Sequence, residues 1–218
     1  MSQKETYYAP DSIRSKSREI LSSVAGIPHE RLIFKPAHSA LLVLDMQGYF
    51  LNPSSHAFIP SAPAILPGVN ALIRCYTRHH LPVFVTRHLN TSEDAGLMAT
   101  WWRDLVRAED PLSTLDSRLE QGIGLEIQKT RYDAFFNSPL EELLHEQHVS
   151  QVVICGVMTH LCCETTARSA FMRGFEVFFT VDGTATYTEA FHRASLLNLS
   201  HGFAVPVLVE NILEKLDG

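Results

Sequence analysis

The chain has 218 residues, 45% of them hydrophobic, and a formal net charge of -6 at pH 7. This length allows one sizeable core, and an acidic chain without a basic face excludes nucleic-acid partners. No apolar run approaches the roughly 20 residues that span a bilayer, and the N-terminus lacks a signal-peptide core. We therefore expect a cytoplasmic protein that does not contact membranes.

The first 36 residues are mostly polar and are predicted to form an N-terminal extension, with one main domain over residues 37–218. Within the extension, a helix is expected from about Asp11 or Ser12 to Val24. The sequence contains no internal repeat and no second domain.

From Ser39 onward, strand-like and helix-like segments alternate along the chain. Short apolar runs are typical of buried parallel strands, and the segments between them have helical character. Strands are expected at residues 40–45, 82–87, 123–129, 152–156, 176–182 and 204–209, and helices at 67–80, 138–146, 164–174 and 188–201. Ser138, followed by Pro139 and Glu141, is typical of a capped helix start. The alternation predicts an α/β fold with a parallel sheet of five or six strands and helices on both faces.

Polar residues at the carboxyl ends of the predicted strands are candidates for chemistry, because ligands of open parallel sheets bind there. Asp45, Lys129 and Cys162 follow three different strands, and Arg87 and His88 follow another. Together the first three suit a cysteine nucleophile whose proton passes to the carboxylate, with the lysine stabilising both charges. Each residue alone has a plainer interpretation as a loop cap, a solvated cation or a small packing residue.

Two adjacent thiols, Cys162 and Cys163, precede the helix expected at residues 164–174. Unpaired N–H groups and the helix dipole favour a thiolate at such a position, although free cysteines are often simply buried. The four cysteines form no CxxC pair, so we expect reduced thiols and neither a disulfide framework nor a zinc knuckle.

Three segments resemble the signature blocks of the isochorismatase-like, or cysteine hydrolase, superfamily: Leu44–Phe50, Gln128–Leu140 and Gly156–Cys162. Three ordered blocks at the expected strand ends are more specific than any single motif. The resemblance implies a three-layer α/β/α Rossmann-like sandwich with a central six-stranded parallel sheet. It also implies that Asp45, Lys129 and Cys162 are the catalytic residues and that Cys163 is a packing residue.

The resemblance further implies a non-proline cis peptide bond at Val157–Met158. The backbone N–H groups of Met158 and Cys162 would then form an oxyanion hole for a carbonyl under attack. Gly156 suits a close-packed turn at this point, although a glycine that merely ends a strand is equally common.

The cysteine at position 162 bears on which activity of the superfamily to expect. Isochorismatases cleave a vinyl ether with the Asp as acid, need no nucleophile and commonly carry a small residue at this position. Cys162 therefore favours hydrolysis of a small-molecule amide, carbamoyl or related bond through a covalent thioester. Isochorismatase activity stays open as an alternative, because the N-terminal extension, residues 131–140 and His160 resemble isochorismatases. A non-catalytic thiol redox sensor on the same fold is a further alternative.

We expect neither a metal nor another cofactor. Nicotinamidases of this superfamily hold a metal with an Asp and His residues in the loop after the first strand. The corresponding residues 56–67 contain one histidine, His56, and no carboxylate, whereas a divalent ion usually needs about three protein ligands.

The expected partner is a small-molecule substrate, and members of the superfamily are usually dimers or tetramers, so we expect a homodimer or homotetramer. Residues after the strand ends are expected to line the pocket: Phe50, Arg87, Trp101, Tyr132 and Thr159. Arg87 suits a substrate carboxylate, or else lies on the surface. Trp101 and Trp102 are expected in a lid helix or a subunit interface.

Overall fold

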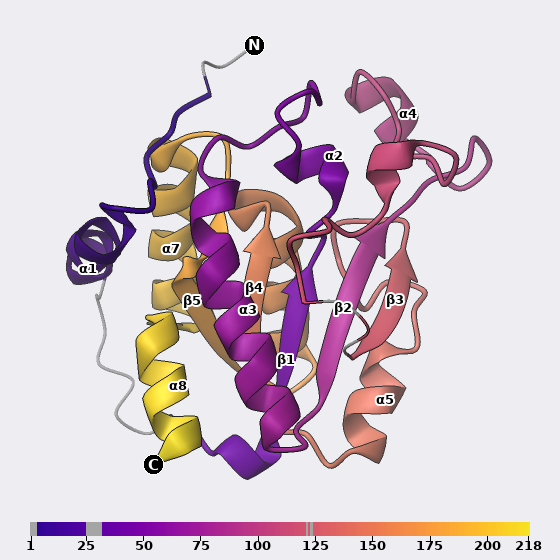
Figure 1. The fold of residues 1–218 in the computed structure, drawn as a ribbon. Coiled ribbons are helices and arrows are strands. Elements are labelled where there is room, and N and C mark those ends of the chain that lie inside the picture. The colour runs from indigo at the N-terminus through magenta and orange to yellow at the C-terminus, as the bar shows by residue number, and fades with distance from the viewer. Residues whose placement is uncertain (1–3, 25–31, 121, 123) are drawn as a thin grey trace.

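Six parallel strands form the centre of the molecule in the order β3-β2-β1-β4-β5-β6 (Figure 1). The computed structural model describes residues 4–24, 32–120, 122 and 124–218. The strands span Ser39–Leu44 (β1), Val83–His88 (β2), Leu125–Lys129 (β3), Gln151–Val157 (β4), Glu176–Ala185 (β5) and Val205–Val207 (β6). Every residue of β1 and β4 is buried, as is typical of strands covered on both faces. The predicted α/β fold with a six-stranded parallel sheet is confirmed.

Helices cover both faces of this sheet. They are α1 (Ile13–Val24), α2 (Gly48–Leu51), α3 (Ala62–Arg78), α4 (Met98–Trp101), α5 (Leu140–Glu146), α6 (Glu164–Met172), α7 (Glu189–Gly202) and α8 (Val209–Asp217). Connections between parallel strands are right-handed. The chain passes through α3 from β1 to β2 in one direction across the sheet, and through α6 and α7 from β4 towards β6 in the other. Helix α3 therefore lies on the opposite face of the sheet from α6 and α7. Accordingly, α3 packs against α8 on one face (Figure 1). On the other face, α6 packs against α7. None of these described helices is long and apolar enough to cross a membrane.

The strand order reverses between β1 and β4, and this reversal positions the candidate site. Connections leave these two strands in opposite directions, which opens a crevice beyond their carboxyl ends. Asp45 follows β1, and a π-helical turn, η3 (Thr159–Cys163), follows β4. Leu44 and Gly156 are register partners at the ends of the two strands, so Asp45 and the turn lie side by side.

Two helix predictions need correction. The helix expected from Pro67 begins at Ala62, with Pro63 in the first turn, where no N–H is required, and Pro67 inside the helix. The last apolar segment is a strand of three residues followed by the unpredicted α8. Val209, Ile212 and Leu216 of α8 are buried at helical spacing, so a periodic signal was present in the sequence.

The start of α5 differs slightly from the predicted cap. Pro139, and not Ser138, takes the N-cap position, and the Ser138 hydroxyl accepts a hydrogen bond from the Leu140 N–H at 3.3 Å. Glu141 does not reach back to the helix start, because its carboxylate pairs with Arg173 at 2.9 Å.

The described part of the N-terminal extension is integrated into the main core. Tyr8, Ile20 and Val24 are at most 2% exposed and belong to the same hydrophobic cluster as the central strands. The described segment from Lys4 through α1 therefore packs against the main domain. Residues 25–31 of the extension lie outside the described residues.

Gly156 occupies a position that excludes any side chain. Its φ is +114°, and a Cβ atom there would lie 2.1 Å from the carbonyl oxygen of Leu44 on the neighbouring strand. Neither backbone can move without breaking the pairing of β1 with β4. The predicted close-packed turn is therefore present, and glycine is required by the approach of β1.

We expect Gly156→Ala to lower the free energy of unfolding by more than about 3 kcal/mol, because the clash is with rigid backbone. Gly174→Ala is the matched control, since Gly174 has a φ of +89° but no atom lies within 4 Å of the place that an alanine Cβ would occupy. That control should lose only the roughly 1–2 kcal/mol cost of a left-handed alanine. Urea denaturation measures both variants, and equal losses would contradict the proposed clash.

Candidate active site

Three side chains from separate strand ends converge beyond the carboxyl edge of the sheet. The Lys129 Nζ atom lies 2.7 Å from Asp45 Oδ2 and 3.3 Å from Cys162 Sγ. The side chains of Asp45 and Lys129 have no solvent exposure, and Cys162 is 6% exposed. The tertiary structure therefore brings together the three residues that the sequence singled out.

The Lys129 ammonium group is surrounded by acceptors. It forms an ion pair with Asp45 and donates to Cys162 Sγ, to the carbonyl oxygen of Arg131 at 2.9 Å and to His88 Nδ1 at 3.3 Å. An ammonium group can only donate, so His88 Nδ1 accepts, and His88 Nε2–H donates to Asn90 Oδ1 at 2.8 Å. Burial and the charge of Lys129 lower the pKa of His88 to about 4, which keeps the imidazole neutral.

The cluster contains an ion pair, formed by Asp45 and Lys129, beside the neutral thiol of Cys162. Burial alone would raise the pKa of Asp45, but the charge of Lys129 outweighs burial and holds this pKa below its ordinary value. Burial lowers the pKa of Lys129, but Asp45 and Cys162 oppose burial and raise it to about 12. Burial and the Asp45 carboxylate raise the pKa of the Cys162 thiol to about 12, although Lys129 lowers it in part.

This protonated thiol corrects the expectation that a helix N-terminus would favour a thiolate at position 162. Cys162 lies inside the π-helical turn η3, before α6 begins at Glu164, and burial dominates its ionisation. Cys163 is fully buried in the hydrophobic core, in agreement with the expected packing role. The adjacent cysteines thus have different environments.

The carboxylate of Asp45 is held by the neighbouring strand. The Thr86 hydroxyl donates to Asp45 Oδ1 at 2.6 Å and accepts the Asp45 N–H at 3.1 Å. Gln47 joins the ends of β1 and β2, because its side-chain amide donates to the His88 carbonyl at 3.1 Å and accepts the His88 N–H at 2.8 Å. The roles of Thr86, Gln47 and His88 were not predicted from the sequence, although His88 was among the polar residues expected at the strand ends. Side chains along β2 alternate between the two faces of the sheet, so Thr86 and His88 lie on one face and Arg87 on the other. This two-residue period is the sequence signal that could have placed Thr86 and His88 together.

The backbone before the cysteine has the expected conformation. The Val157–Met158 peptide bond is cis, as the family resemblance implied. The carbonyl oxygen of Met158 accepts the N–H groups of Leu161 and Cys163 at 3.1 and 3.2 Å. No described residue accepts a hydrogen bond from the Met158 N–H, and Met158 lines the pocket beside Cys162.

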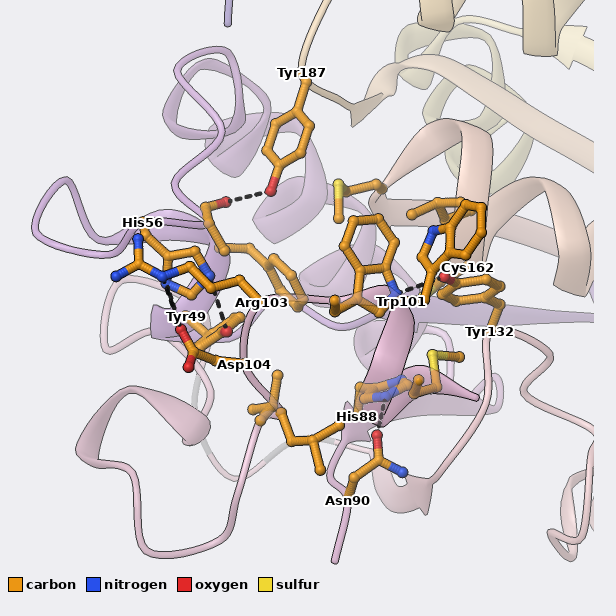
Figure 2. Close-up of a pocket in the computed structure, with 18 of the residues that line it drawn as sticks. Tyr49, His56, His88, Asn90, Trp101, Arg103, Asp104, Tyr132, Cys162 and Tyr187 are labelled. Carbon is orange, nitrogen blue, oxygen red and sulfur yellow. Dashed lines mark hydrogen bonds and ion pairs between the residues drawn. The ribbon is translucent and has the colours of Figure 1, made fainter. Parts of the chain in front are cut away.

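A cavity of about 460 Å³ leads to Cys162. Figure 2 shows Tyr132 and Cys162 at one end of it and His56, Arg103 and Asp104 at the other. The wall is mainly aromatic and apolar, with these members: Tyr49, Phe50, Trp101, Trp102, Leu105, Val106, Tyr132, Met158, Leu161, Tyr187 and Phe191. Such a pocket suits a small, mostly apolar ligand with a few polar contacts.

Three of the five residues expected to line the pocket do so: Phe50, Trp101 and Tyr132. Trp101 lies on the short helix α4 and is 78% exposed. Its neighbour Trp102 donates its indole N–H to the Tyr132 hydroxyl at 2.7 Å. This bond uses one acceptor position of the Tyr132 oxygen and leaves its O–H available as a donor.

The structure corrects the expectation for the other two residues. Arg87 alternates with Thr86 and His88 on β2, so it points to the opposite face, where its guanidinium pairs with Glu126 at 3.1 Å. Thr159 is fully buried, and its hydroxyl bonds to His192 Nδ1 at 3.0 Å. Neither residue lines the cavity.

The groups near the pocket do not suit a divalent metal ion. Among the described residues, the polar side-chain groups near the His56 ring are the Asp104 carboxylate, at 3.7 Å, and the Tyr49 hydroxyl, at 3.4 Å. Asp45, His88 and Cys162 have ligand atoms within 4.8 Å of one another, but the Lys129 ammonium already lies among them. A metal ion at that position would be repelled by the buried cation.

Comparisons with known proteins relate this site to characterised families. Residues 39–211 match the Isochorismatase domain model. Nicotinamidase 3 of Arabidopsis thaliana is 39% identical over 83% of this chain and 89% of its own length. Enterobactin synthase component B of Escherichia coli K12 is 31% identical over 83% of this chain and 64% of its own. A cysteine hydrolase structure from Pseudomonas syringae pv. phaseolicola 1448A shares the fold, with a TM-score of 0.81, 23% identity and coverage of 86% and 96% of the two chains.

Proposed function

Since the chain belongs to the isochorismatase family of hydrolases, we propose that it hydrolyses a small carboxamide or carbamoyl compound with Cys162 as nucleophile. The observation that carries this proposal is the Asp45–Lys129–Cys162 cluster at the end of an aromatic pocket. The similarity to Nicotinamidase 3 makes nicotinamide the first substrate to test.

In the proposed first step, Asp45 accepts the thiol proton while Cys162 Sγ attacks the substrate carbonyl carbon. The ionised state of Asp45 and the protonated state of Cys162 at rest suit this transfer. Lys129 keeps the carboxylate charged before the transfer and stabilises the sulfur as negative charge develops on it. The Met158 N–H, together with that of Cys162, stabilises the oxyanion.

The second half of the reaction returns the enzyme to its starting state. Collapse of the tetrahedral intermediate expels the amine, which takes the proton from Asp45, and leaves a thioester on Cys162. Asp45 then accepts a proton from water, whose oxygen attacks the thioester carbonyl. The products are a carboxylic acid and ammonia or an amine, and Asp45 returns its proton to the sulfur.

Isochorismatase activity is the second candidate, supported by the match of residues 39–211 to the Isochorismatase domain model. Vinyl ether cleavage needs a protonated acid that delivers a proton to carbon. Lys129 lowers the pKa of Asp45, so its carboxylate is ionised at neutral pH and suits a base better than an acid. For this reason we favour amide hydrolysis.

The redox-sensor alternative has less support from the site. A sensor based on adjacent thiols needs both sulfurs to be accessible. Cys162 lines the pocket, whereas Cys163 is fully buried in the core and burial raises its pKa well above its ordinary value.

A substrate screen tests the proposed function. The purified protein is incubated with nicotinamide, small carbamoyl compounds and isochorismate, and the release of ammonia and the loss of isochorismate are measured. We expect ammonia from at least one carboxamide or carbamoyl compound and no cleavage of isochorismate. Turnover of isochorismate alone would overturn the proposal.

A further inference from the structure

Residues Lys4–Tyr8, here called the N-terminal strap, contact two loops that line the pocket, one at residues 56–58 and one at Tyr187. Lys4 Nζ donates to the carbonyl oxygens of His56 and Phe58 at 2.6 and 2.7 Å and lies 4.4 Å from the centre of the Tyr187 ring. The Glu5 N–H donates to the Tyr187 carbonyl at 2.8 Å. Lys4, His56 and Tyr187 all line the pocket, so the strap forms part of its wall.

A first chain of hydrogen bonds links Tyr7 of the strap to His160 in the turn η3. The Thr186 N–H donates to the Tyr7 hydroxyl at 2.9 Å, and the Thr186 hydroxyl bonds to His160 Nδ1 at 2.6 Å. The His160 ring stacks on Phe191 with 4.5 Å between centroids, and both rings line the pocket. Tyr7 therefore holds the loop that orients a ring two residues before Cys162.

A second chain links Tyr8 to Thr159 at the start of η3, and its direction can be derived. The Tyr8 O–H donates to the Val181 carbonyl at 3.1 Å, so the Tyr8 oxygen accepts from His192 Nε2–H at 3.2 Å. Burial lowers the pKa of His192 to about 3 and keeps the ring neutral, so Nδ1 is an acceptor. The Thr159 hydroxyl therefore donates to Nδ1 at 3.0 Å.

Every member of this second chain is buried: Tyr8, Thr159, Val181 and His192 have no solvent exposure. Loss of one member would leave a buried polar group without its partner, which costs more than the loss of a surface hydrogen bond. The two chains reach η3 at adjacent residues, Thr159 and His160, from one segment about 150 residues away in sequence.

We propose that Tyr7 and Tyr8 are positioning residues that hold the nucleophile turn η3, Tyr7 through Thr186 and His160, and Tyr8 through His192 and Thr159. The proposal rests on the proposed role of Cys162, and it gives the N-terminal strap a function in the active site. Small displacements of a nucleophile reduce rates strongly, so the effect should appear in rate constants.

The test measures two quantities in Tyr7→Phe and Tyr8→Phe variants of the full chain. The first is the alkylation rate of Cys162 by iodoacetamide, followed by mass spectrometry, and the second is the kinetics of nicotinamide hydrolysis. Tyr8→Phe should lower both kcat and the alkylation rate by about tenfold, the usual effect of one misplaced buried hydrogen bond. Tyr7→Phe should raise KM by a similar factor, because its chain ends on the pocket wall at His160.

Tyr76→Phe is the matched control. Tyr76 is also fully buried, and its hydroxyl bonds to Ser39 Oγ at 2.9 Å, at the opposite end of β1 from Asp45. We expect this variant to lower Tm to a similar extent without changing the alkylation rate, kcat or KM. Thr159→Ser retains the donor and should keep the wild-type rates, whereas Thr159→Val should reproduce Tyr8→Phe.

Two outcomes separate this inference from the proposed function. If Tyr7→Phe and Tyr8→Phe behave like Tyr76→Phe in the alkylation rate, in kcat and in KM, the inference is overturned. If the wild-type protein does not hydrolyse nicotinamide, the alkylation rates of Tyr8→Phe, Thr159→Val and Tyr76→Phe still test the positioning of Cys162 by Tyr8. In that case unchanged alkylation in Tyr8→Phe overturns the inference, and a tenfold decrease supports it.

Discussion

Cys162→Ala should reduce amide hydrolysis by a factor on the order of 10⁴ or more, because Cys162 carries the only thiol among the described residues that line the pocket. The fold should be retained, since alanine fills most of the space of a small side chain that only partly faces the cavity. The measurements are kcat for the amide identified in the substrate screen and Tm by thermal unfolding.

Cys163→Ala is the matched control for this variant. It removes the neighbouring thiol, which is fully buried in the core and has no contact with the cavity. We expect Cys163→Ala to keep kcat within about twofold while losing some stability from the cavity that it leaves. Retention of full amide turnover in Cys162→Ala would exclude the covalent mechanism. Retained isochorismate cleavage in Cys162→Ala but not in Asp45→Asn would favour the vinyl ether alternative.

Asp45→Asn should reduce turnover strongly while making Cys162 more reactive toward iodoacetamide. The loss in kcat should be about 10²- to 10⁴-fold, because the proton acceptor is removed. The carboxylate raises the pKa of the thiol, so its removal lowers that pKa and increases the thiolate fraction at pH 7.5. The buried Lys129 ammonium then retains the thiolate as its anionic neighbour.

The pH profile of alkylation measures this change. In the wild type, the alkylation rate should rise with pH and show no plateau below pH 9, since the pKa of Cys162 is about 12. In Asp45→Asn the rate at pH 7.5 should be at least about tenfold higher, because a neighbouring charge shifts a pKa by one unit or more. An unchanged or slower rate would contradict the resting ion pair with a neutral thiol.

Asp182→Asn controls for the general effect of removing a half-buried carboxylate. Burial raises the pKa of Asp182 to about 6, and its side chain accepts the Val209 N–H at the start of α8, away from the pocket. An asparagine oxygen can accept the same hydrogen bond. We expect wild-type turnover and wild-type alkylation of Cys162 in this variant.

Most of the order of strands and helices could be predicted from the amino-acid sequence, because apolar runs and helical periodicity are local signals. The same signals identified Asp45, Lys129 and Cys162, since polar residues that follow parallel strands meet at one edge of the sheet. The resemblance to known signature blocks added the cis bond before Met158. Where the local signals were ambiguous, as at the start of α3 and in α8, the predictions were incomplete.

How these residues are ionised, and which groups hold them, depends on contacts between distant parts of the chain. The pKa of Cys162 depends on burial and on the Asp45 carboxylate, more than 100 positions earlier in the sequence. No local pattern around the cysteine could therefore indicate whether this pKa is raised or lowered. The orientation of Arg87 away from the pocket depends on the pleat of β2 within the sheet. The contacts of the N-terminal strap with the nucleophile turn depend on long-range packing of polar groups, which leaves no periodic signal in the sequence.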